Sequence, residues 1–81
     1  MSNKREEQEA AAVAVSQQLA ALAVAKFGSQ RQAALAVGVD VSTISRALKG
    51  ERVPSVVVLA RMAAAVGRLV VSTSGGSWLL A

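Results

Sequence analysis

The chain has 81 residues, enough for one small domain with a modest core, and it contains neither cysteine nor histidine. These two absences exclude disulfides, thiolate nucleophiles and the usual zinc ligand sets. The net charge is +4, and the segment from Lys26 to Arg68 has seven basic and two acidic residues, a local net charge of +5. A positive middle segment suits a polyanion such as DNA, although a solvated basic surface would have the same composition.

Apolar residues make up 53% of the chain, and most of them are Ala and Val. No uninterrupted apolar run approaches the roughly 20 residues that a membrane-spanning helix needs. We therefore expect no transmembrane helix and no membrane partner. The N-terminus, MSNKREEQEA, is charged with mixed sign, which is not the pattern of a secretory signal. A cytoplasmic, nucleoid-associated location fits these features.

Residues 1–4 are expected to form a flexible arm and residues 5–67 a helical domain. A long helix is predicted from Arg5 to Phe27, because this segment is rich in Ala, Glu, Gln and Leu and contains no Gly or Pro. The residues whose helical spacing points them toward the core are Leu19, Leu22, Ala23 and Phe27. Val13 and Val15 are expected to extend beyond what a compact bundle covers, where they would meet a partner helix or fray.

The segment from Ser29 to Gly50, SQRQAALAVGVDVSTISRALKG, contains two short helical patterns separated by a tight turn. The first pattern, Gln30 to Val37, stops at Gly38, because glycine ends helices by adopting a left-handed backbone without a Cβ penalty. Asp40 is the expected N-cap of the second helix, with its carboxylate accepting from the free backbone N–H groups of the first turn. The segment 29–50 is therefore predicted to be a helix-turn-helix.

A further helix is predicted from Val56 to Val66, with Pro54 and Ser55 as its start signal and Gly67 as its end. Its helical interpretation relies on burial overriding propensity, since the three consecutive valines at its start are poor helix formers. The same valines could instead form a strand.

Residues 68–81, RLVVSTSGGSWLLA, have the pattern of a β-hairpin: strand formers, a Ser/Gly-rich turn, and strand formers again. A two-stranded hairpin is not stable alone in water, so it should pack on the helices, on a second copy of the chain, or on both. The candidate dimerisation residues are Leu69, Val71, Trp78 and Leu80. The alternative is an apolar flap that closes the core of its own chain. The predicted fold is mainly α, a bundle of four to five helices with a C-terminal β-hairpin.

A helix-turn-helix contacts DNA by placing its second helix in the major groove, with the N-terminal part of that helix at the base edges. The inward residues of the second helix are expected to be Ile44, Ala47 and Leu48. The outward residues, which are the candidates for base contacts, are Val41, Ser42, Ser45 and Arg46. Arg46 can bond guanine O6 and N7, the serines can bond several bases, and Val41 can touch a thymine methyl group. The candidates for contacts to the DNA backbone are Gln30, Arg31, Thr43, Lys49 and Arg52.

At these positions the chain resembles the Cro and Xre-type helix-turn-helix family of phage and bacterial repressors. The family has Gln at the first motif position, a small residue at the fifth, Gly at the ninth and an aliphatic residue at the fifteenth. The residues at these positions here are Gln30, Ala34, Gly38 and Ile44. The segment PSVVVLARMAAAVG is similar to the family's fourth helix. The KFG before the motif and the VVSTSGGSWLL after it are similar to the small Cro repressors, where a C-terminal strand region joins the dimer.

The leading hypothesis is a transcriptional repressor that binds double-stranded DNA at a pseudo-palindromic operator as a homodimer. One alternative is an antitoxin that autoregulates its operon with the same motif and masks a toxin partner. Another is a protein-interaction adaptor in which the bundle is only a scaffold for the apolar hairpin. No enzyme activity, cofactor or metal is expected, because the chain lacks His and Cys and its glycines form no phosphate-binding loop.

Overall fold

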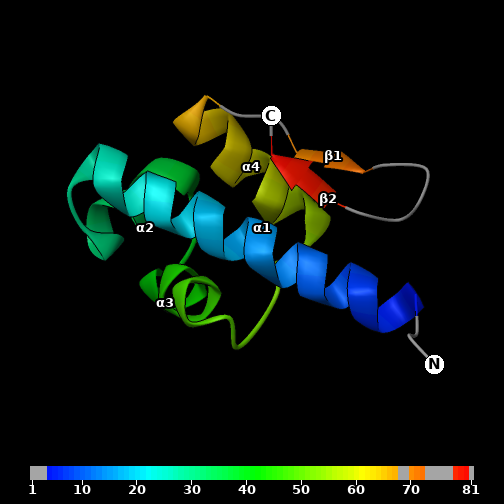
Figure 1. The fold of residues 1–81 in the computed structure, drawn as a ribbon. Coiled ribbons are helices and arrows are strands. Elements are labelled where there is room, and N and C mark those ends of the chain that lie inside the picture. The colour runs from blue at the N-terminus through cyan, green and yellow to red at the C-terminus, as the bar shows by residue number, and fades with distance from the viewer. Residues whose placement is uncertain (1–3, 68–69, 73–77, 81) are drawn as a thin grey trace.

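The computed structural model describes residues 4–67, 70–72 and 78–80, and within them it contains four helices followed by two short strands (Figure 1). The elements are α1 (Lys4–Phe27), α2 (Gln30–Val37), α3 (Val41–Lys49), α4 (Val56–Val66), β1 (Val70–Ser72) and β2 (Trp78–Leu80). The predicted helical bundle is confirmed. Because α1 begins at Lys4, the predicted arm of residues 1–4 is one residue too long, and residues 1–3 lie outside the described part.

The long helix α1 lies at the centre of the bundle and contacts α2, α3 and α4 (Figure 1). Leu19, Ala20 and Ala23 are fully buried on its inner side. The prediction that Val15 extends beyond the covered surface is wrong, since this residue is only 5% exposed. Leu22, predicted to face the core, is half-buried. The bundle therefore covers more of the N-terminal half of α1 than the sequence pattern indicates.

The C-terminal 18 residues of α1, Ala10–Phe27, are apolar and long enough to cross a membrane by length and composition alone, with a mean hydropathy of 1.4. Core helices of small helical domains share these properties, because a helix surrounded by other helices is apolar on several sides. Here the segment packs against the three other helices of the bundle. Of the residues in this segment, 28% are buried, so packing in the bundle accounts for part of its apolar character.

The turn between α2 and α3 has the predicted stop at Gly38, whose backbone is left-handed with φ 83°. Its N–H donates to the carbonyl of Ala34 at 2.8 Å. The expected side-chain cap at Asp40 is not formed: only its backbone carbonyl takes part, accepting from Thr43 N–H at 3.0 Å. The free carboxylate is solvent-exposed, where water can satisfy it. The preceding helix, α2, does have a side-chain cap: the hydroxyl of Ser29 accepts from Gln32 N–H at 3.1 Å.

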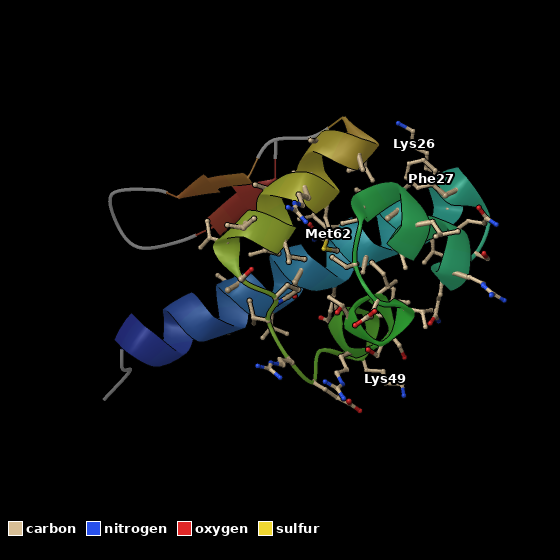
Figure 2. All side chains as sticks on the ribbon, turned by 180° about the vertical axis from the view of Figure 1, so that it is seen from behind. Lys26, Phe27, Lys49 and Met62 are labelled. Atoms are coloured by element: carbon tan, nitrogen blue, oxygen red, sulfur yellow. The ribbon has the colours of Figure 1, made fainter. Side chains whose placement is uncertain are left out.

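The valines at the start of α4 are helical, which confirms the predicted range Val56–Val66. The Ser55 hydroxyl accepts from Val58 N–H at 3.3 Å and caps the first turn. Leu59, Met62 and Ala63 are buried, and Met62 lies in the interior between the helices (Figure 2). Burial of this face, together with the cap, overrides the low helix propensity of the valines.

The strands β1 and β2 pair in antiparallel register, with Val71 opposite Leu79. β2 lies beside α1 and β1 lies beside α4. Leu69 and residues 73–77, which include the predicted turn, lie outside the described residues. The dimerisation role predicted for Leu69, Val71, Trp78 and Leu80 stays a prediction.

Candidate functional site

The helix α3 has two chemically distinct faces. Ile44 and Ala47 are fully buried against the core, and Leu48 is half-buried beside them. The inward orientation predicted for these residues is confirmed. On the opposite face the exposed residues are Ser42, Arg46 and Lys49, and Val41 at the start of the helix is 48% exposed. The solvent-exposed face of the helix therefore consists mainly of hydroxyl and basic side chains.

Of the four candidates for base contacts, Ser45 is the least accessible, because it is half-buried at the edge of the outer face. Lys49 lies on the same side of α3 as Ser42, two helical turns further along. The long, exposed side chain of Lys49 thus continues the surface that the base-contact candidates begin. A backbone-contact candidate and base-contact candidates accordingly share one helix face.

A cavity of about 390 Å³ lies where α3, the following loop and the start of α4 meet. Its lining residues are Thr43, Arg46, Arg52, Val53, Pro54, Ser55 and Val58. The structure thus brings together three of the predicted site residues, Thr43, Arg46 and Arg52, from two segments of the chain. Two guanidinium groups beside a threonine hydroxyl can bind an oxyanion such as a phosphate through charge-assisted hydrogen bonds.

The predicted site did not include the residues that α4 and its preceding loop add to this cavity. Val53, Pro54, Ser55 and Val58 form its second wall. Their only signal in the sequence is the adjacency of Arg52 to the Pro-Ser helix start. That adjacency indicates a helix beginning near a basic residue, but it does not indicate that this helix start lines a cavity together with α3.

The remaining basic residues of the middle segment do not all share this surface. Lys26 donates from Nζ to the carbonyl of Ala65 at 2.9 Å, at the C-terminal end of α4. Figure 2 shows Lys26 at the top of the view and Lys49 at the bottom, well apart from each other. Arg61 extends toward the turn between α2 and α3, where its Nη1 lies 4.0 Å from the position that a Cβ on Gly38 would occupy. The basic residues of the middle segment are therefore spread over several parts of the surface and not gathered at α3 alone.

The two candidates on α2, Gln30 and Arg31, are both exposed in its first turn. They lie outside the lining of the cavity at α3 and α4. The two helices of the motif are in contact with each other. Gln30 and Arg31 therefore form a separate polar group at the start of the first helix of the motif, where they would meet a different part of any extended ligand.

In a comparison with known families, a family model described as "Helix-turn-helix" matches residues 28–68. This range begins just before α2 and ends just after α4, so it includes the α2–α3 turn, the outer face of α3 and the cavity beside it. No curated protein and no solved structure matches the chain significantly.

Proposed function

Because this chain belongs to the Cro/C1-type helix-turn-helix family of DNA-binding transcription regulators, we propose that it is a repressor that binds a pseudo-palindromic operator as a homodimer. The observation that carries the proposal is the division of α3 into a fully buried apolar face and an exposed face of hydroxyl and basic side chains. A helix of this kind can enter the major groove without exposing apolar surface.

In the proposed complex, the outer face of α3 contacts base edges through Val41, Ser42, Ser45 and Arg46. Arg46 supplies the most specific contact, because its planar guanidinium can form two hydrogen bonds with one guanine. Thr43, Lys49 and Arg52 contact phosphates, together with Gln30 and Arg31 on α2. These contacts supply affinity and orientation but little discrimination between sequences.

Dimerisation is proposed because a single short recognition helix contacts few base pairs. A second copy would double the number of base pairs contacted. A twofold dimer would place its half-sites about 34 to 36 Å apart on one side of the DNA. The proposed interface combines the hairpin with the outer face of α4, and β1 contacts α4. On that face Val56 and Val57 are 67% and 62% exposed. The Val and Ala side chains of this face form an apolar surface that a second copy could cover.

Bound at a promoter, such a dimer would prevent polymerase from occupying the same DNA. The experiment that tests the proposal is selection of bound duplexes from a random pool, with the mass of the protein–DNA complex measured in parallel. We expect a palindromic consensus and two chains per site. Absence of any enriched sequence would refute specific DNA binding, and a non-palindromic consensus bound by one chain would refute the homodimer alone.

A further inference from the structure

The middle of α1 contacts the C-terminal end of α3 through a residue outside the core positions that the helical spacing of α1 predicts. Gln17 donates from Nε2 to the backbone carbonyl of Leu48 at 3.4 Å, between residues 31 positions apart in the sequence. Gln17 is half-buried there, whereas its neighbour Gln18 is exposed. The contact ties the helix before the motif to the helix that carries the base-contact candidates.

The carbonyl of Leu48 is one of the last four of α3, which have no partner within the helix. Two others of these four are satisfied by the chain that follows. The carbonyl of Ala47 accepts from Gly50 N–H and that of Arg46 accepts from Glu51 N–H, each at 3.1 Å. Gln17 therefore satisfies a third of these carbonyls with a donor that the local backbone does not supply.

Gly50 fits this contact because it lacks a side chain. A Cβ built on Gly50 would lie 2.7 Å from Nε2 of Gln17 and 3.3 Å from Cγ1 of Val13. Such an atom would displace the Gln17 amide from its place beside Leu48. Gly50 is also left-handed, with φ 70°, so any other residue would be strained there. The end of α3 is thus packed closely on α1.

We propose that Gln17 is a positioning residue for DNA recognition, which sets the orientation of α3 by bonding its C-terminal end. The inference rests on the proposed function, since it concerns how the same helix meets the bases. The turn from α2 limits the position of the start of α3, and Gln17 limits that of its end. Base contacts depend on this orientation to within about an ångström, whereas phosphate contacts through long side chains tolerate small displacements.

The test compares Gln17→Met with Gln18→Met. Methionine keeps the approximate length and helix propensity of glutamine but removes the donor. Dissociation constants are measured at one salt concentration for the selected operator and for a random duplex. For Gln17→Met we expect about a fivefold loss of operator affinity and unchanged affinity for random DNA, in line with the loss of one hydrogen bond. Gln18→Met should match the wild-type protein on both duplexes.

Several outcomes would overturn the inference. If Gln17→Met kept wild-type discrimination, or lost affinity for both duplexes alike, the residue would have only a structural role. If the wild-type protein itself did not discriminate between the duplexes, both the inference and the proposed function would fail. If the wild-type protein discriminates between the duplexes and Gln17→Met discriminates equally well, the inference fails but the proposed function stands.

A second variant tests the same contact without changing Gln17. In Gly50→Ala the added Cβ would displace the Gln17 amide, so adding Gln17→Met to it should cause little further loss of discrimination. Independent, multiplicative losses in the double variant would contradict the proposed contact. The comparison between Gln17→Met and Gln18→Met decides the matter if the strained Gly50→Ala variant does not fold.

Discussion

The helices α3 and α4 differ in what they present to solvent. Both bury an apolar face in the same core, through Ile44 and Ala47 on α3 and through Leu59 and Met62 on α4. The outer face of α3 is made of hydroxyl and basic side chains, whereas that of α4 is made of Val56, Val57, Ala60 and Ala64. The only charged residue of α4, Arg61, extends toward the end of α2.

This difference fits the two partners of the proposed function. A polar and basic outer face is well solvated and attracts a polyanion, so α3 is stable in water and suited to DNA. An exposed row of apolar side chains gains free energy when another apolar surface covers it, so the outer face of α4 is suited to a second copy of the chain. Helices of similar length in one small core can thus serve the two parts of the proposed function.

The largest expected effect comes from the inner face that α3 shares with the core. Ile44→Ala should destabilise the fold by about 2 to 5 kcal/mol, because it removes three buried carbon atoms and leaves a cavity. For a domain of this size such a loss lowers the melting temperature by roughly 10 °C or more. Thermal denaturation monitored by circular dichroism measures it.

Val41→Ala is the matched control, since it truncates another β-branched residue of α3 that is 48% exposed. It should lower the melting temperature far less than Ile44→Ala. Equal melting temperatures for the two variants would contradict the division of α3 into a buried and an exposed face.

The outer face of α3 should affect DNA binding rather than folding. Arg46→Ala should weaken operator binding by about 1 to 3 kcal/mol and relax specificity at one base position. Lys49→Ala should instead weaken operator and random DNA alike and reduce the slope of log affinity against log salt by about 1. Titrations of both variants on both duplexes at several salt concentrations separate the two roles. Equal losses on operator and random DNA for Arg46→Ala would argue against its base contact.

The smallest effect on folding is expected on the outer face of α4. Val57→Lys should change the free energy of unfolding of the monomer by no more than about 0.5 kcal/mol, because the side chain is 62% exposed. It should nevertheless shift the protein from dimer to monomer, since two lysines would face each other across the proposed interface. Sedimentation equilibrium measures the mass.

Ala25→Lys is the control, because it adds the same charge at an exposed alanine of another helix, α1. It should leave the mass unchanged. If Val57→Lys remained a dimer, the interface would not include the outer face of α4.

The local structure of the motif follows closely from the sequence. The predicted limits Gln30–Val37 and Val56–Val66 agree with α2 and α4, and the inward set of α3 agrees with the burial observed. These features depend on neighbours along the chain: a serine cap, a glycine with positive φ and the spacing of apolar residues on a helix. The outer face of α3 is determined in the same way, because whatever does not face the core must face solvent.

Only the tertiary structure decided which residues of different helices and loops come together. The sequence contains Arg46, Arg52 and Ser55, but only the path of the chain between α3 and α4 places them around one cavity. Only the packing of α1 shows that Val15 is buried and that Gln17 reaches Leu48. Helix periodicity specifies which residues share a face, whereas the distance between faces of different helices depends on how all the side chains fill the core together.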